Sequence, residues 1–307
     1  METQYSRGLV SVIIPTYKRA NMLLRAVDSV LNQTYKNIEV LVVNDNEPGD
    51  EHTNDLKEIL LKYTDERLNY IEQKKHVNGA VARNVGIKLA KGEYIAFLDD
   101  DDYWKSEKIE KQVNVLEELD NSWGGVACRK KFYLGGKLVK ATLPYKDGYV
   151  FEHVLLRNIE ITTGTLLMRR EALDDAGYFD ENLLRYQDVQ LFAFLTQKYK
   201  IKLMQDFFLC AHIDDNSNRL NPQKLISAKK SFFNSVEPLM KSLPKRKKTR
   251  VYNMHQFDIG IAMIKHREFK SGLKMISFVF KDPVSTYYAV KKTLVKIVET
   301  KLRNFIV

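Results

Sequence analysis

The sequence predicts an α/β fold, a parallel sheet with helices on both faces, followed by a helical C-terminal extension. Over the first hundred residues, short apolar runs alternate with stretches whose apolar residues recur at helical spacing, as in strands joined by crossover helices. Beyond residue 221 only the helical pattern continues. With 307 residues, the chain can bury a large core in one domain with an extension, or in two domains.

The first expected strands are short apolar runs at residues 10–14, 38–43, 68–71 and 94–98. The amphipathic stretches between them predict helices over residues 19–31, 50–63 and 80–90. Ligands of such sheets bind beyond the carboxyl ends of the strands. The segments that follow these strands are therefore the first place to look for a functional site.

The middle of the chain predicts a hairpin centred on residues 134–137, which contain Gly135 and Gly136, and thus a mixed sheet edge. Further along, a strand is expected over residues 161–169, a helix near 189–198 and a strand over 201–212. We expect a domain boundary near residues 216–222, which gives one domain over 1–218 and a helical region over 219–307. Pro244 and five basic residues should break the helical pattern at residues 241–248.

The composition favours a cytoplasmic protein. No apolar stretch approaches the ~18 residues of a membrane span, and residues 1–8 lack the apolar core of a secretory signal. Cys128 and Cys210 form neither a metal-ligand spacing nor a disulfide framework, which fits a reducing compartment.

The net charge of +10 is concentrated at the C-terminal end. Residues 241–307 hold 16 Lys and Arg against 4 Asp and Glu, a net of +12, whereas the preceding 240 residues hold 33 against 35, a net of −2. A basic region of this kind attracts an anionic membrane surface or nucleic acid.

Four consecutive aspartates at residues 99–102 directly follow the expected strand at 94–98. Crowded carboxylates repel one another, and a folded chain tolerates them mainly where a cation neutralises them. Oxygen ligands suit Mg²⁺ or Mn²⁺, which one or two carboxylates hold together with substrate phosphates. The sequence therefore predicts a metal-bound phosphate site, and the alternative is a solvated acidic turn that caps a helix over residues 105–119.

Polar groups also follow the first two strands, at Pro15 and Tyr17 and around Asp45. Because the carboxyl ends of parallel strands meet at one edge of a sheet, these groups and the aspartates should converge in one crevice.

These segments together resemble glycosyltransferase family 2 over about residues 9–220. The resemblance is carried by VSVIIPTYKR at 10–19, QTY at 33–35, Asp45, ARNVG at 82–86, KG at 91–92 and FLDDDD at 97–102. It implies a Rossmann-like nucleotide-sugar-binding sheet, the type A glycosyltransferase fold, with residues 1–218 as the catalytic domain. It also implies a divalent metal, Mn²⁺ or Mg²⁺, and sugar transfer with inversion.

The resemblance assigns roles to the residues of the nucleotide crevice. Asp45 matches the aspartate that reads the base, which favours a UDP donor; its alternative is an Asx turn. Pro15 and Tyr17 would line the nucleotide, and Arg83, near the start of a helix, would hold the pyrophosphate; alternatively, Arg83 is a solvated helical residue.

The resemblance also assigns roles in the metal site and in catalysis. Asp99 would contact ribose or metal-bound water, Asp100 could share that role, and Asp101 would bind the metal. His212, at the end of the last expected strand, would be a second metal ligand or a structural histidine. Asp188 would be the general base that removes the acceptor proton, and its alternative is a helix N-cap.

Asp282 and Pro283 predict the N-cap and first position of a long C-terminal helix. The helix would carry an apolar stripe of Tyr287, Val290, Leu294, Ile297, Val298, Leu302 and Phe305. Its other face would carry Lys292, Lys296, Glu299 and Arg303. Such a helix either packs on the catalytic domain or docks on an anionic membrane, at the inner face where a lipid-linked acceptor would lie.

The leading hypothesis is an inverting, metal-dependent hexosyl- or N-acetylhexosaminyltransferase for cell-surface polysaccharide, with a nucleotide-sugar donor and a glycan or lipid-linked acceptor. A nucleotidyltransferase and an inactive nucleotide-sugar-binding homologue are the alternatives. A nucleic-acid-binding protein is disfavoured, because the first 240 residues are slightly acidic and carry no known binding motif. The sequence leaves the oligomeric state open.

Overall fold

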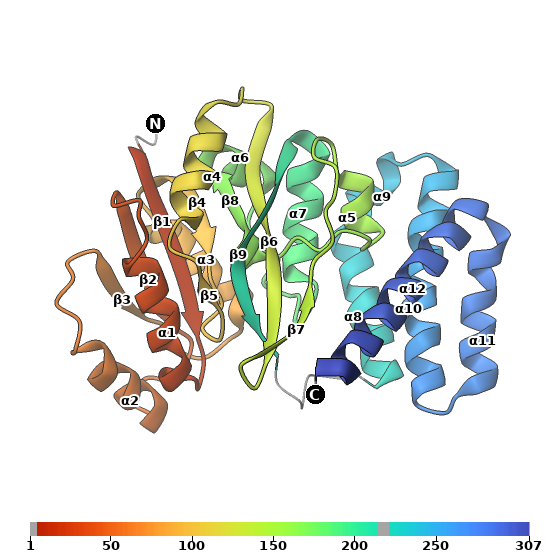
Figure 1. Ribbon diagram of the computed structural model, residues 1–307, viewed down its shortest axis with the longest axis horizontal. Helices are drawn as coiled ribbons and strands as arrows, with labels where there is room; N and C mark the ends of the chain where they lie inside the picture. Colours follow the sequence, from red (N-terminus) through yellow and green to blue (C-terminus); the bar gives the residue numbers. More distant parts are fainter. Residues whose placement is uncertain (1–4, 214–220, 307) are drawn as a thin grey trace.

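A computed structural model describes residues 5–213 and 221–306. In this part of the chain, nine strands form one sheet in the order β3-β2-β1-β4-β8-β6-β9-β5, with β7 paired to β6. The sheet occupies one side of the molecule, and the C-terminal helices lie beyond β7 and α7 on the other side (Figure 1). None of the described helices is long and apolar enough to cross a membrane.

The first half of the sheet is parallel, as the sequence predicts. It consists of β1 (Ser6–Thr16), β2 (Ile38–Asn44), β3 (Leu68–Glu72) and β4 (Gly92–Phe97). The connecting helices are α1 (Ala20–Leu31), α2 (Glu51–Leu60) and α3 (Gly79–Leu89). The parallel pairing brings the carboxyl ends of β1, β2 and β4 to one edge of the sheet.

The second half of the sheet is mixed. Its elements are β5 (Tyr103–Trp104), β6 (Trp123–Leu134), β7 (Lys137–Ala141), β8 (Leu166–Arg169) and β9 (Lys200–His212). The hairpin of β6 and β7 confirms the expected turn at residues 134–137. The mixing extends beyond the predicted edge, because β8 also runs antiparallel to both β4 and β6 in the middle of the sheet.

Three short elements have no counterpart in the sequence prediction. β5 has two residues, α5 (Phe151–Leu155) has five and α6 (Arg170–Ala176) has seven, all too short to show a clear hydrophobic period. The expected strand at 161–169 is a 3₁₀ turn, η1 (Thr163–Thr165), followed by β8. The longer helices α4 (Lys108–Glu117) and α7 (Gln187–Lys198) lie near their predicted positions.

Helices cover both faces of the sheet, and each face has its own apolar core. One core joins α1, α2 and α4 to the sheet, and the other joins α3, α5, α6 and α7 to it. The packing is tight at Gly86 of α3, where an added Cβ would lie 2.5 Å from Cγ2 of Ile13. Gly86 thus allows α3 to sit directly on β1.

The C-terminal region is helical, as predicted. It comprises α8 (Pro222–Ser235), α9 (Glu237–Ser242), α10 (Lys245–Lys265), α11 (Phe269–Ser277), η2 (Phe278–Lys281) and α12 (Pro283–Ile306). The predicted break falls at Leu243 and Pro244, but α10 begins at Lys245, inside the basic run. Phe232, Met254 and Val279 of this region belong to the same core as α5 and α7, so the helices pack firmly on the sheet domain.

Asp282 caps α12 as predicted, because its carboxylate accepts the backbone N–H of Ser285 at 2.8 Å. The helix packs through Ser285 and Ala289, which are 0% and 4% exposed. The apolar side chains of Tyr287, Val290 and Leu294 are instead 61%, 49% and 57% exposed. The rest of the predicted stripe and basic face, from residue 296 onward, lies outside the side chains that the structure describes.

Candidate functional site

Loops at the carboxyl ends of β1, β2 and β4 meet in one place, as the sequence predicts. The backbone N–H of Asp45, after β2, donates to the carbonyl of Thr16 at the end of β1 at 2.9 Å. The Thr16 hydroxyl donates to Oδ2 of Asp100, after β4, at 2.9 Å. Residues from three strands are therefore held together by direct hydrogen bonds.

Asp45 is buried and already hydrogen-bonded. Its Oδ1 accepts the side-chain N–H of Gln73 at 2.7 Å and the backbone N–H of Val77 at 3.1 Å, and its Oδ2 lies 3.2 Å from Nδ1 of His76. Burial raises the pKa of Asp45, while the bond from Val77 and the charge of His76 lower it. The result is a fixed carboxylate at the floor of a small polar recess.

An aromatic pair lies above this recess. The rings of Tyr17 and His76 stack with their centroids 4.1 Å apart, and Tyr17 is 39% exposed. The loop of Asp45 is held by Asn46, whose Oδ1 accepts the backbone N–H of Lys18 at 2.9 Å. Flat rings beside a fixed carboxylate are suited to a heterocyclic base, which stacks on one group and hydrogen-bonds to the other.

The four-aspartate loop, residues 99–102, is held by cations and backbone groups. Oδ1 of Asp99 accepts from Arg83 at 2.6 Å, and Asp100 and Asp101 accept from Arg19 at 3.3 and 2.6 Å. Oδ1 of Asp102 accepts the backbone N–H of His212 at 2.9 Å. The alternative of a helix cap is wrong, because α4 begins at Lys108 with Glu107 at its N-cap.

Burial makes the ionised form of two aspartates unfavourable. It raises the pKa of Asp100 to about 6, and it raises that of Asp102 to about 8. Asp99 and Asp101 add to both increases by charge repulsion. Crowding and burial therefore oppose full ionisation of the loop, and a divalent cation would favour the ionised form.

The predicted metal ligands do not form a complete protein cage. Among residues 5–213 and 221–306, no three His, Cys, Asp or Glu side chains converge as they would around a metal. His212 reaches the loop through its backbone N–H to Asp102. The loop still fits Mg²⁺ or Mn²⁺ shared with a ligand's phosphates, since such sites need only one or two protein carboxylates.

Arg83 connects the aspartate loop to the start of α7. Its guanidinium donates through Nη2 to Asp99 at 2.6 Å and through Nη1 to Oε1 of Gln187 at 3.3 Å. Its Nε is buried and makes no hydrogen bond. The solvated alternative for Arg83 is wrong, because the side chain is 14% exposed. A buried, unpaired donor next to the aspartates suits an oxyanion.

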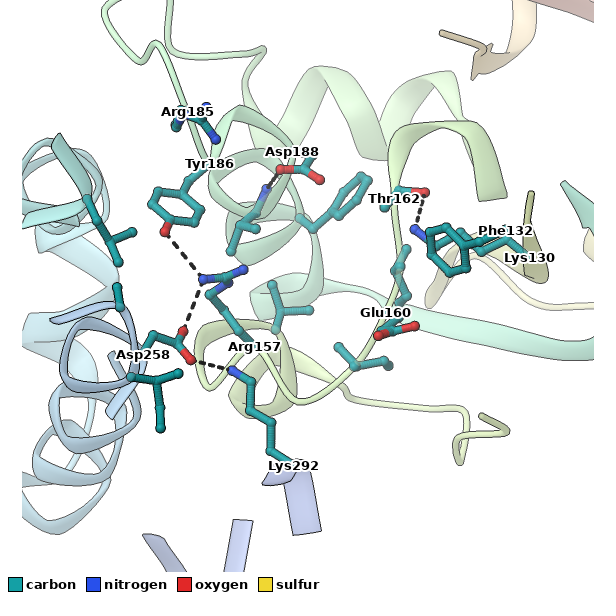
Figure 2. A pocket seen from close by; sticks show the side chains of 18 of the residues that line it. Lys130, Phe132, Arg157, Glu160, Thr162, Arg185, Tyr186, Asp188, Asp258 and Lys292 are labelled. Atoms are coloured by element: carbon teal, nitrogen blue, oxygen red, sulfur yellow. Dashed lines mark hydrogen bonds and ion pairs between the residues drawn. The ribbon is translucent and has the colours of Figure 1, made fainter. Parts of the chain in front are cut away.

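Asp188 lies in the first turn of α7, and Tyr186 occupies the N-cap position in a left-handed conformation. Oδ1 of Asp188 accepts the backbone N–H of Val189 at 2.8 Å. The carboxylate lines a large cavity between the sheet domain and the C-terminal helices (Figure 2). Asp188 thus directly follows Gln187, which Arg83 contacts, and its carboxylate faces the cavity.

This space, the large cavity, has a volume of about 1040 Å³. Its charged and titratable lining comprises Lys130, Arg157, Glu160, Arg185, Asp188, Asp258, Lys265, His266 and Lys292. Figure 2 shows Arg157 at its centre, between Tyr186 and Asp258, and Lys292 at Asp258 from the other side. The sheet domain and the helical region therefore build this cavity jointly.

Some residues of the Asp45 recess and of the large cavity could not be identified from the sequence. Gln73 and His76 lie in a loop without a recognisable motif, and Arg157 and Asp258 come from elements about a hundred residues apart. Lys292, expected on the basic face of α12, instead donates to Asp258 at 2.7 Å. Trp104 has a packing role, since it is 3% exposed and its Nε1 donates to the carbonyl of Gly164.

Sequence comparison relates the chain to known transferases. The profile of glycosyl transferase family 2 matches residues 11–177. The *Escherichia coli* protein WfaP, described as a UDP-Glc:α-D-GlcNAc-diphosphoundecaprenol β-1,3-glucosyltransferase, is 42% identical over 172 residues, or 55% of this chain and 64% of that protein. WfgD, of the same description and organism, is 26% identical over 269 residues, or 87% and 98%. The chain spans about a third of the length of several uncharacterised *Rickettsia* glycosyltransferases that it matches.

Structural comparison identifies the type A glycosyltransferase fold. *S. aureus* TarS 1–349, solved with UDP-GlcNAc, aligns with a TM-score of 0.60 and 19% identity over 85% of this chain and 73% of that one. The mannosyltransferase PcManGT of *Pyrobaculum calidifontis*, solved with GDP-Man and Mn²⁺, aligns with a TM-score of 0.60 and 14% identity over 96% and 83%. At these identities the alignments establish the fold alone.

Proposed function

The chain belongs to glycosyltransferase family 2, and we propose that it transfers a sugar from a nucleotide-diphospho-sugar to a hydroxyl of a lipid-linked glycan in cell-surface polysaccharide synthesis. One observation carries this proposal. The Arg83 guanidinium contacts both Asp99 of the aspartate loop and Gln187, the neighbour of Asp188. A phosphate site and a candidate base are thereby joined through one side chain.

The donor is a UDP-sugar. The uracil imide donates its N–H to Asp45, and the base stacks on the Tyr17 and His76 side of the recess, while Pro15 lies at its edge. Asp99 and Asp100 face the ribose, and Arg83 holds the diphosphate. Family membership and the names of WfaP and WfgD, which use UDP-Glc, support this assignment.

Asp188 is the general base. It accepts the proton of the acceptor hydroxyl as that oxygen attacks the anomeric carbon from the face opposite UDP, so the configuration inverts. Arg83 holds the departing diphosphate close to α7, the helix that carries Asp188, because its guanidinium contacts both Asp99 and Gln187. Bound through Asp101 near His212, Mn²⁺ or Mg²⁺ would neutralise the charge that develops on the leaving phosphate.

The enzyme works at a membrane surface. Tyr287, Val290 and Leu294 form an exposed apolar row on α12. Lys291 of α12 and Lys281 before it are exposed as well. An apolar row flanked by lysines fits an anionic bilayer, and a lipid-linked acceptor would be found there.

Titration of UDP into the purified chain tests the donor assignment. We expect binding with Mn²⁺ and a large loss of affinity with EDTA, because a diphosphate beside four carboxylates is repelled unless a cation lies between them. Asp101→Asn should remove the effect of Mn²⁺, whereas Asp206→Asn, at an exposed position on β9, should leave it unchanged. Equal UDP affinity with EDTA and with Mn²⁺ would contradict the metal-bound phosphate site.

A further inference from the structure

At the large cavity, three basic side chains converge on one carboxylate. Asp258 of α10 accepts from Arg157 at 3.1 Å, Lys229 at 3.1 Å and Lys292 at 2.7 Å. One carboxylate therefore faces three basic side chains. Buried or half-buried charges are normally matched by opposite charges, so basic side chains that share one carboxylate favour a further anion beside them.

The other described charged side chains of the cavity are mostly basic. Oε1 of Glu160 is paired with Lys140 at 2.5 Å, and its Oε2 is buried without a hydrogen-bond partner. Asp188 lies on α7, and Lys130, Arg185 and Lys265 also line the cavity. Basic side chains therefore outnumber carboxylates among the described residues of the lining.

The pKa values of Asp258 and Lys229 reflect the positive charges that surround them. Burial alone would raise the pKa of Asp258, but Lys292, Lys229 and Arg157 together hold it far below its usual range. Burial, together with the neighbouring charges of Arg157 and Lys292, lowers the pKa of Lys229 to about 7 against the effect of Asp258. A second anion in the cluster would relieve this repulsion.

The backbone is held in an unusual conformation at the same place. Arg157 and Tyr186 have φ values of +53° and +63°, in the left-handed region that non-glycine residues rarely adopt. Their side chains meet: Nη1 of Arg157 donates to the Tyr186 hydroxyl at 3.4 Å, and the guanidinium lies 4.7 Å from the ring centroid. Such conformations gather at ligand-binding sites, where the surrounding structure fixes them.

We propose that Arg157 and Lys292 bind the diphosphate of the acceptor, so that the large cavity is a receptor for a sugar-diphosphate lipid. This inference rests on the proposed function. The acceptor sugar would lie between this cluster and Asp188, with its reacting hydroxyl at Asp188 and its anomeric phosphate at Arg157. Figure 2 shows Arg157 between the α7 wall and Asp258, as this orientation requires.

A second, smaller cavity next to the cluster could take up the start of the lipid chain. It has a volume of about 160 Å³, shares Arg157, Glu160 and Lys292 with the large cavity, and has Leu143, Tyr145, Tyr288 and Val295 in its wall. The cations thus stand at the boundary between a polar and a more apolar space. A sugar-diphosphate lipid has the same order of groups along its length.

Acceptor kinetics test the proposal. One probe is α-GlcNAc diphosphate carrying a short alkyl chain, and the other is the alkyl glycoside of GlcNAc without the diphosphate. Lys292→Gln should raise KM for the diphosphate probe about tenfold, since a charge-assisted hydrogen bond is lost. KM for the neutral glycoside and for UDP-Glc should not change. Lys270→Gln, an exposed site on α11, is the matched control, and equal KM changes for both acceptors would overturn the proposal.

Binding of inorganic pyrophosphate in EDTA is a second test that does not need turnover. Wild type and Asp101→Asn should bind it equally, and Lys292→Gln should bind it more weakly. Asp258→Asn should melt at a lower temperature because it removes the carboxylate that three cations share, yet pyrophosphate should stabilise it more than wild type. If pyrophosphate stabilises Asp258→Asn no more than wild type, the cluster is a structural ion pair only.

These outcomes separate the proposal from the function on which it rests. A chain that binds UDP with Mn²⁺ but shows no preference for the diphosphate acceptor, and no pyrophosphate binding that depends on Lys292, keeps the proposed function and loses this inference. A chain that binds no nucleotide, but binds pyrophosphate through Lys292, loses the proposed function and keeps the anion site.

Discussion

The donor edge, the region to which we assign the donor, comprises Pro15, Tyr17, Asp45, Arg83 and residues 99–102. It differs in construction from the large cavity. The donor edge comes from consecutive strand ends within the first third of the chain. The cavity is lined by β6, α5 and the segment after it, α7, α8, α10 and α12, from Lys130 to Lys292. The family profile covers the whole donor edge and the cavity residues up to Thr162, and stops at residue 177. The donor edge thus lies wholly inside the family profile, whereas the cavity is completed by helices beyond it.

The largest effect should come from Asp188, which lines the cavity and, as the proposed base, acts on the acceptor hydroxyl. Asp188→Asn preserves size and removes the proton acceptor, so turnover should fall ~10²–10⁴-fold while UDP binding with Mn²⁺ is kept. Asp175→Asn, at an exposed carboxylate that pairs with Lys198 on α7, should leave both unchanged. A loss of turnover smaller than about tenfold would assign the base to another residue.

Substitution of Arg83 should affect both regions, because its guanidinium contacts Asp99 at the donor edge and Gln187 of α7. Arg83→Gln removes bonds to Asp99 and Gln187, so KM for the donor should rise roughly 10–100-fold, as expected for charge-assisted bonds. Arg67→Gln breaks a comparable pair with Asp65 beside β3 and is the control. An unchanged donor KM in Arg83→Gln would show that Arg83 does not bind the diphosphate of the donor.

A smaller effect is expected from the exposed row on α12. Replacing Tyr287, Val290 and Leu294 by serine should weaken vesicle binding by at least about tenfold, since full burial of even one large apolar side chain contributes about 1.5–3 kcal/mol. Transfer to a soluble acceptor should persist. Leu61→Ser removes a side chain that is 82% exposed on the sheet domain and should not affect vesicle binding. Unchanged sedimentation of the triple variant would exclude this row as the membrane contact.

The sequence predicts the donor edge because its chemistry follows directly from strand ends. Asp45 and the aspartates stand immediately after apolar runs, so their convergence follows from a parallel sheet alone. Gln73 and His76 bind Asp45 from a loop with no periodic pattern, and nothing in the local sequence indicates them. The antiparallel insertion of β8 depends on long-range pairing with β4 and β6, which single-chain periodicity does not encode.

The cavity was not predictable for a different reason. Arg157 and Asp258 become partners only after α10 packs against α5, and no motif links residues so far apart. For Lys292, the helix was predicted but the direction of the side chain was not. The apolar stripe suggested that Tyr287 and Leu294 would face a core if α12 packed, yet the helix packs through Ser285 and Ala289. Small residues allow close helix approach, and the apolar row is left outside.

Hydrogen–deuterium exchange on the wild-type chain tests the division into two regions most directly. UDP with Mn²⁺ should slow exchange at residues 15–19, 44–46 and 99–102 and leave α10 and α12 unchanged. The alkyl GlcNAc-diphosphate probe should slow exchange at residues 156–162 and 185–189 and in the turns of α10 and α12 that carry Asp258 and Lys292. Protection of α10 and α12 by UDP, or of residues 99–102 by the acceptor probe alone, would contradict the account.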